Sequence, residues 1–166
     1  IPLHVDAASG GFIAPFLNPE IKWDFRLEQC SSINVSGHKY GLVYPGIGWA
    51  LWKNADDVPS SLVTETNVLG FVEKSFSLNF SRGGAMILAQ YYNFVRLGWQ
   101  GYFDIQNTMR ENARYLASEL EKIGRFDILN NGKLTPSCIA KLKDSSKFNE
   151  ADLVAKLRED NWIIPA

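Results

Sequence analysis

Two short segments of the chain carry side chains that could do chemistry together. Lys39 stands in the run SGHKYG at 36–41, directly after a strand pattern and between two glycines. Glycines let a backbone and a ligand come close, and a lysine amine held there can form a Schiff base with an aldehyde. Taken alone, a lysine in a glycine-rich turn is more often an ordinary surface residue. Asp6, at the end of an earlier strand pattern, strengthens the chemical interpretation, because such a carboxylate can pair with a protonated ring nitrogen.

Short strands followed by tight turns must position these groups. The apolar residues within 3–5 predict a buried strand that enters the small-residue run AASGG at 7–11. Alternating polar and apolar residues predict a second strand over 32–36. Residues 48–52 predict a third strand after a turn.

A parallel arrangement of the first two strands would bring Asp6 and Lys39 to one edge of the sheet. Ala7 and Ala8 are small enough to admit a flat ring against the backbone beside Asp6. His4 shares the strand face of Asp6 by the two-residue period and could orient it, although a buried core histidine is the better interpretation.

The second half of the chain changes from strand patterns to helix patterns. Ser81 is a natural N-cap for the first helix, and Gly98 is a natural stop. The change near residues 98–112 predicts a boundary between a strand-rich part and an α+β part, with a long helix as connector. The elements predicted in this half are helices over 81–97, 101–123 and 149–160, and strands over 126–129 and 138–142.

The composition excludes several classes of function. The chain has 166 residues, 46% of them hydrophobic, and a formal net charge of −1, so nucleic acid is not an expected partner. Its apolar runs are a few residues long, far too short for a membrane span. We find no P-loop, no complete dinucleotide fingerprint and no metal-site pattern. Cys30 and Cys138 lie far apart, which predicts reduced thiols and a reducing compartment, the cytoplasm.

The run HVDAASGGF at 4–12, taken with SGHKYG at 36–41, resembles the pyridoxal-phosphate-dependent glutamate decarboxylases of the group II decarboxylase family. The pattern Asp-x-Ala followed by His-Lys is common to that family and to sphingosine phosphate lyase, so it specifies cofactor and fold. The run SGHKYG together with WDFRL at 23–27 is narrower and points to glutamate. Further segments that agree in order and spacing are APF at 14–16, GW at 48–49, LNFSR at 78–82, QYY at 90–92 and GY at 101–102.

The resemblance implies an α/β fold, part of a fold-type I enzyme of the aspartate aminotransferase kind. Residues 1–109 would form the second half of the cofactor-binding large domain, with a mixed sheet. Residues 110–166 would begin the α+β C-terminal small domain. We expect the chain to be truncated at both ends and the isolated piece to be inactive, because the family's remaining phosphate-binding and substrate-binding residues would lie outside it.

Five residues receive roles from the resemblance. Lys39 would hold pyridoxal 5'-phosphate as an internal aldimine and then act as an acid or base. Asp6 would keep the pyridine nitrogen protonated, and Ala8 would pack on the ring face. His38 would contact the phosphate, unless it is simply a structural histidine. Ser81 would contact the phosphate of the neighbouring subunit, although a simple N-cap is nearly as good an interpretation.

We therefore expect a carboxy-lyase that converts L-glutamate to 4-aminobutyrate and CO₂, working as a homodimer or larger homo-oligomer. The chain departs from the family at 68–71, where it reads VLGF and the relatives carry a tyrosine on a mobile loop that helps protonate the product. Val68 in that place suggests slower protonation or decarboxylation-dependent transamination. The same residues are also compatible with a decarboxylase of a different amino acid, or with a catalytically inactive structural relative.

Overall fold

The computed structural model describes residues 1–67, 70–75 and 81–165, which divide into two compact units. The first unit is Ile1–Tyr102 and the second is Phe103–Ala166. The domain boundary expected after residue 109 stays a prediction. Among the described residues, no helix combines the length and the apolar character that crossing a membrane requires.

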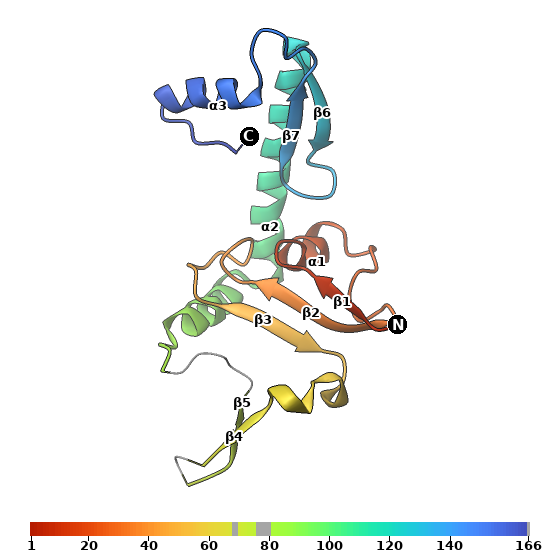
Figure 1. The fold of residues 1–166 in the computed structure, drawn as a ribbon, viewed down its shortest axis with the longest axis vertical. Helices are drawn as coiled ribbons and strands as arrows, with labels where there is room; N and C mark the ends of the chain where they lie inside the picture. The colour runs from red at the N-terminus through yellow and green to blue at the C-terminus, as the bar shows by residue number, and fades with distance from the viewer. Residues whose placement is uncertain (68–69, 76–80, 166) are drawn as a thin grey trace. The chain divides into compact units, whose positions relative to one another are not determined.

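The first unit is built on a three-stranded mixed sheet in the order β1-β2-β3 (Figure 1). β1 (Leu3–Asp6) pairs in parallel with β2 (Cys30–Ser36), and β2 pairs antiparallel with β3 (Gly48–Trp52). The three strands and the parallel pairing of the first two confirm what the sequence patterns predicted. Because parallel strands end at the same edge of a sheet, the turns after β1 and β2 leave from that edge together.

Alternation along β1 and β2 gives the sheet one apolar face and one polar face. Ile33 and Val35 of β2 are buried on the apolar face, in a core cluster that includes Phe12 and Tyr102. The alternate positions of the same strands place four polar side chains on the opposite face: His4, Asp6, Ser32 and Asn34.

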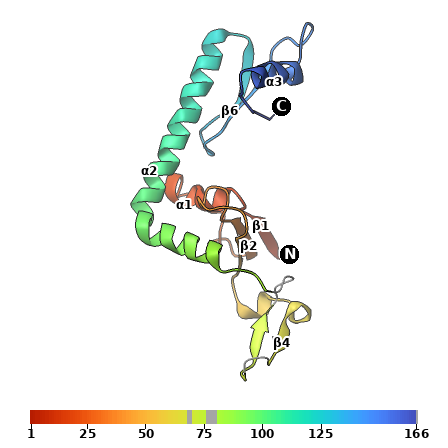
Figure 2. The same ribbon diagram turned by 90° about the vertical axis from the view of Figure 1, so that its left-hand side faces the viewer.

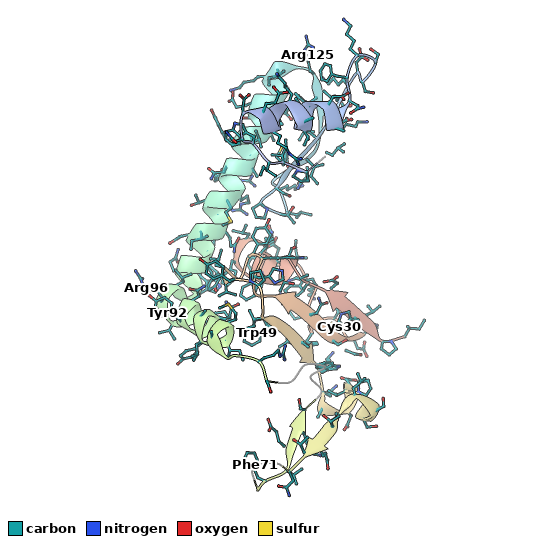
Figure 3. All side chains as sticks on the ribbon, turned by 60° about the vertical axis from the view of Figure 1, so that its left-hand side comes forward. Cys30, Trp49, Phe71, Tyr92, Arg96 and Arg125 are labelled. Atoms are coloured by element: carbon teal, nitrogen blue, oxygen red, sulfur yellow. The ribbon has the colours of Figure 1, made fainter. Side chains whose placement is uncertain are left out.

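An aromatic cluster joins the next long helix, α2 (Ala85–Ile123), to the apolar face of the sheet. The ring centroids of Phe12 and Tyr102 lie 5.7 Å apart, and those of Trp49 and Phe94 lie 5.9 Å apart. Trp49 lies between β3 and the helix, while Arg96 projects away from the sheet (Figure 3). Aromatic pairs of this kind stabilise the unit by more than the burial of their apolar surface alone contributes.

The start of α2 corrects one expectation. Ser81 has φ 52°, which is outside the helical range, and the helix begins at Ala85. The predicted N-cap role of Ser81 is therefore wrong. Gly83 and Gly84 directly precede the helix, and the low helix propensity of glycine explains why it starts late.

Gly98 interrupts α2 as the sequence predicted, although the helix resumes directly after it. Its dihedral angles, φ 58° and ψ −166°, are not helical and suit glycine, which has no Cβ. The helical segment that precedes Gly98 is drawn in green in Figure 2. The helix then continues to Ile123, and Gly124 follows it with φ 77°, in agreement with the predicted end.

Short elements that the sequence did not predict fill the connections of the first unit. The strands β4 (Thr64–Thr66) and β5 (Glu73–Ser75) form an antiparallel hairpin, with the exposed Phe71 in the turn between them (Figure 3). The short helix α1 is Ala14–Leu17. Within the described residues, three single turns of 3-10 helix also occur: Gly10–Phe12, Ala55–Asp57 and Ser60–Leu62.

The second unit contains the end of α2, a hairpin of β6 (Phe126–Asn131) and β7 (Cys138–Leu142), and α3 (Glu150–Glu159). These elements confirm the predicted strands and helix. Asn149 caps α3: its side chain accepts from the Asp152 amide at 3.1 Å, and Asp152 accepts from the Asn149 amide at 2.9 Å.

Candidate active site

The carboxylate of Asp6, at the carboxyl end of β1, is held through one of its two oxygens. The Ala8 amide and the Asn34 side-chain nitrogen each donate to Oδ1 at 3.0 Å, and neither of these bonds uses Oδ2. These two hydrogen bonds, followed by the charges of Lys39 and His4, hold the pKa of Asp6 below its ordinary value of 3.8. The group is therefore an ionised carboxylate whose Oδ2 can accept a proton donor from a ligand.

The turn after β2 carries Lys39 and His38, whose side chains are exposed. The charge of Lys39 acts on Asp6, so the two groups lie within electrostatic reach of each other. A backbone hydrogen bond of 3.2 Å from the Ser36 amide to the Ala8 carbonyl ties this turn to the one after β1. The structure thus brings Asp6, Ala8 and Lys39 to one edge of the sheet, with His38 beside Lys39.

Side chains of α2 hold the turn that carries the lysine through hydrogen bonds to its backbone. The carbonyl of Gly41 accepts hydrogen bonds from Gln90 Nε2 at 2.9 Å and from the Tyr102 hydroxyl at 3.0 Å. Asn93 Nδ2 donates to the Leu42 carbonyl at 2.7 Å. Burial raises the pKa of Tyr102, so its hydroxyl remains a neutral donor. The backbone after Lys39 is therefore held by two buried side chains, Gln90 and Tyr102, and by the half-buried Asn93.

The two glycines of this turn are required by packing rather than by ligand approach. A Cβ on Gly41 would lie 2.5 Å from the Gly37 carbonyl oxygen and 2.9 Å from Phe12 Cε2. A Cβ on Gly37 would lie 2.6 Å from Gln90 Oε1 and 2.7 Å from Ile47 Cγ2. The sequence interpretation linked these glycines to a ligand, whereas the structure shows the turn folded tightly on itself and against α2.

The change Gly41→Ala should destabilise the complete protein by about 1–3 kcal/mol, because the new methyl group would press on a backbone carbonyl that cannot move aside. Gly10→Ala is the matched control, since a Cβ there has no atom within 4 Å. The control should be neutral or slightly stabilising. Urea unfolding measures both, and equal midpoints for the two variants would contradict the packing argument.

One predicted site residue does not join this cluster. Ser81 is exposed, and within the described part of the chain it makes no hydrogen bond to the other four predicted site residues. Val68 lies outside the described residues.

In the parts of the chain that the structure covers, no three His, Cys, Asp or Glu side chains gather in a way that could hold a metal ion.

Three residues that position the site were not singled out as site residues from the sequence. Asn34 could have been found, because the two-residue period places it on the Asp6 face once β1 and β2 are taken as parallel. Gln90 and Tyr102 entered only as parts of the family resemblance. Their contacts with Gly41 join residues far apart in the chain, and no local pattern signals such contacts.

The residues at this edge fit a cofactor that has both an aldehyde and a basic ring nitrogen. Oδ2 of Asp6 is placed to accept from a protonated ring nitrogen, and the amine of Lys39 is exposed for reaction with an aldehyde. The small, half-buried Ala8 lies between them in the chain and leaves room for a flat ring. These features define a site of the pyridoxal-phosphate class.

Residues 1–141 match the family model described as the pyridoxal-dependent decarboxylase conserved domain. The chain belongs to the pyridoxal-dependent decarboxylase family, and its cofactor is accordingly pyridoxal phosphate.

Curated relatives carry the similarity through the whole chain. This chain is 52% identical over 165 residues to glutamate decarboxylase of Petunia hybrida, a match that covers 99% of this chain and 33% of the relative. It is 48% identical over 166 residues to glutamate decarboxylase beta of Listeria monocytogenes, covering 99% of this chain and 36% of the relative. The chain thus spans about a third of the length of these relatives.

Two solved structures confirm the fold class. Glutamate decarboxylase of Lactobacillus brevis matches with a TM-score of 0.94 and 44% identity, over 99% of this chain and 38% of that one. Sphingosine-1-phosphate lyase of Burkholderia pseudomallei matches with a TM-score of 0.78 and 24% identity, over 99% of this chain and 38% of that one. The second likeness concerns the fold alone. The chain has the mixed α/β architecture of fold-type I pyridoxal-phosphate enzymes, as the sequence predicted.

Proposed function

We propose that the complete protein is a carboxy-lyase that converts L-glutamate to 4-aminobutyrate and CO₂. The relatives in Petunia and Listeria, at 52% and 48% identity, are named glutamate decarboxylases, which supports this choice of substrate. The observation that carries the proposal is the pairing of two groups at one sheet edge. Ionised Asp6, with Oδ2 outside its two hydrogen bonds, lies within electrostatic reach of Lys39.

When bound, pyridoxal phosphate supplies an electron-accepting ring that stabilises the negative charge left on the substrate's α-carbon after CO₂ departs. Lys39 would hold the cofactor covalently through Nζ and yield that position to the substrate amine, after which Nζ can move a proton. Asp6 would accept a hydrogen bond from the ring nitrogen at Oδ2 and keep that nitrogen protonated. Ala8 would lie against the ring face, and His38 would donate to the phosphate.

A homo-oligomer completes the proposed site, with Ser81 as a phosphate contact contributed by the neighbouring subunit. The exposed apolar side chains in the first half of α2 support an association of this kind. Ile87, Leu88, Tyr91 and Val95 are 63%, 69%, 65% and 69% exposed. Such a stripe on one helix is typical of a surface that another part of the complete protein or another subunit covers.

A charged side chain introduced into this apolar face of α2 should lower the mass of the assembly. Leu88→Glu in the complete protein should shift the assembly toward monomer, because it would bury a carboxylate at the contact. Thr108→Glu is the control, since it adds the same charge at an exposed polar position further along α2. Sedimentation equilibrium measures the mass. An unchanged mass for Leu88→Glu would argue against this face as the contact.

The cytoplasm is the proposed compartment. Cys30 and Cys138 are both free thiols, which suits a reducing environment.

The direct test of the proposed function combines a spectrum, a covalent label and a product. The complete protein is mixed with pyridoxal phosphate, reduced with borohydride and digested, and the labelled peptide is mapped. A label on Lys39, followed by CO₂ and 4-aminobutyrate release from glutamate in a fresh sample, is the expected result. Pyridoxamine phosphate formed during turnover would indicate transamination. A spectrum that responds only to a different amino acid would change the substrate, and the lack of any chromophore would favour an inactive relative.

A further inference from the structure

Four polar side chains form a block on the face of the sheet opposite the core. Along β1, His4 and Asp6 occupy alternate positions, and the parallel register places Ser32 opposite His4 and Asn34 opposite Asp6. These four residues lie on the side of the sheet away from the buried Ile33 and Val35. The apolar core therefore does not depend on them, and their arrangement calls for another explanation.

An unbroken chain of three hydrogen bonds runs through the block and ends on Asp6. Ser32 Oγ lies 2.7 Å from His4 Nδ1, and His4 Nε2 lies 2.9 Å from Asn34 Oδ1. Asn34 Nδ2 then donates to Asp6 Oδ1 at 3.0 Å. Because Asn34 donates through its nitrogen, its oxygen must accept, so His4 carries a proton on Nε2. In the neutral ring, Nδ1 then accepts from the Ser32 hydroxyl, and every donor points toward Asp6.

The orientation of the Asn34 amide matters for the carboxylate of Asp6, where the series of hydrogen bonds ends. An asparagine amide can turn over and present either its oxygen or its nitrogen to a neighbour. An amide oxygen facing Asp6 Oδ1 would repel it. With a proton on Nε2, His4 also disfavours that orientation, because a turned amide would set the Asn34 nitrogen, a second donor, against the Nε2–H group. The charged or titratable groups in this network are Asp6, His4 and, through its charge on Asp6, Lys39.

We propose that Asn34 is the positioning residue of the cofactor site, holding Asp6 Oδ1 so that Oδ2 faces the ring nitrogen, and that His4, supported by Ser32, locks the Asn34 amide in its donating orientation. The inference rests on the proposed function and deepens it. It assigns His4 a place one step further from the carboxylate than a direct orienting role would. The effect of removing each member should therefore decrease in the order Asn34, His4, Ser32.

The first test uses Asn34→Leu in the complete protein, since leucine has nearly the shape of asparagine but no donor. The cofactor dissociation constant should rise about tenfold, because the variant loses a hydrogen bond to a charged group. The same loss removes one cause of the lowered pKa of Asp6, so the acid limb of the cofactor-binding pH profile should move to higher pH. Gln29→Leu, an exposed amide just before β2, is the matched control and should change neither quantity.

The second test compares two replacements of His4. Glutamine places an amide nitrogen near the position of Nε2 and can still donate to Asn34, whereas phenylalanine keeps the ring but cannot donate. His4→Gln should keep most of the cofactor affinity and the wild-type acid limb, while His4→Phe should move both in the direction of Asn34→Leu. Because neither change touches the core, this pair remains informative if Asn34→Leu proves unstable in thermal unfolding.

These experiments distinguish a failure of the positioning roles of Asn34 and His4 from a failure of the proposed function. If borohydride labels Lys39 and glutamate is decarboxylated, but Asn34→Leu matches the Gln29→Leu control, the positioning role is overturned. Equal behaviour of His4→Gln and His4→Phe overturns the role of His4 as the lock. If wild-type protein gives no label on Lys39, the proposed function itself fails.

Discussion

Lys39→Ala should lower glutamate decarboxylation by about 10³-fold or more and abolish the borohydride-stable label on the peptide 36–41. Both losses have one origin, because the same Nζ is proposed to hold the cofactor and to move a proton during turnover. The turn itself should survive, since its fixed points are the carbonyls of Gly41 and Leu42 rather than the lysine side chain. The circular dichroism spectrum and the unfolding midpoint should therefore stay near the wild-type values.

Lys39→Arg separates charge from nucleophilicity. The guanidinium keeps a positive charge near Asp6 but cannot attack an aldehyde as an amine does. It should therefore be as inactive as Lys39→Ala, while Lys22→Ala, at another exposed lysine, should be fully active. Added methylamine should restore part of the activity of Lys39→Ala, because it replaces the missing amine. Substantial decarboxylation by Lys39→Arg would show that another group performs the reaction.

The parts of the fold that the sequence predicted well are those with local signals. β1 and β2 have alternating or apolar runs, and Gly98 and Gly124 carry the positive φ angles that their positions in helix patterns suggested. The serine at 81 predicts the start of α2 wrongly, because glycines 83 and 84 after it oppose helix formation and α2 begins at Ala85. The sequence carries no local signal for the β4–β5 hairpin, because its strands are only three residues long and mostly exposed, so no apolar alternation marks them.

The candidate site likewise contains residues that the sequence predicts and residues that it does not. Asp6 and Lys39 could be proposed from residue types and spacing, and the parallel pairing of β1 with β2 confirms the geometry that links their strands. The strand pattern does not single out Asn34, because an asparagine within such a pattern indicates only a solvent-facing position. Its importance depends on the register, which sets it opposite Asp6, and register is a property of two strands rather than one.

Asp6→Asn should lower kcat by about 10²- to 10³-fold while the turn after β1 stays intact. Asparagine retains Oδ1, which can still accept from the Ala8 amide and from Asn34 Nδ2. Its amide nitrogen replaces Oδ2, however, and presents hydrogen where the wild-type residue presents a negatively charged acceptor. A ring nitrogen facing this donor is held unprotonated, so the ring accepts electrons poorly. The loss should therefore fall on kcat more than on KM.

A permanently charged ring tests that reasoning directly. Pyridoxal phosphate methylated on the ring nitrogen needs no carboxylate to keep its charge, and Asp6→Ala leaves room for the methyl group. The methylated cofactor should restore part of kcat to Asp6→Ala and should impair the wild-type protein, where Oδ2 would face a methyl group. If the methylated cofactor brings no recovery, or if Asp6→Asn turns over at the wild-type rate, Asp6 does not act through the ring nitrogen. Asp6→Glu, which keeps the charge but displaces it by one methylene, should fall between the wild type and Asp6→Asn, because Asn34 and the Ala8 amide are positioned for the shorter side chain.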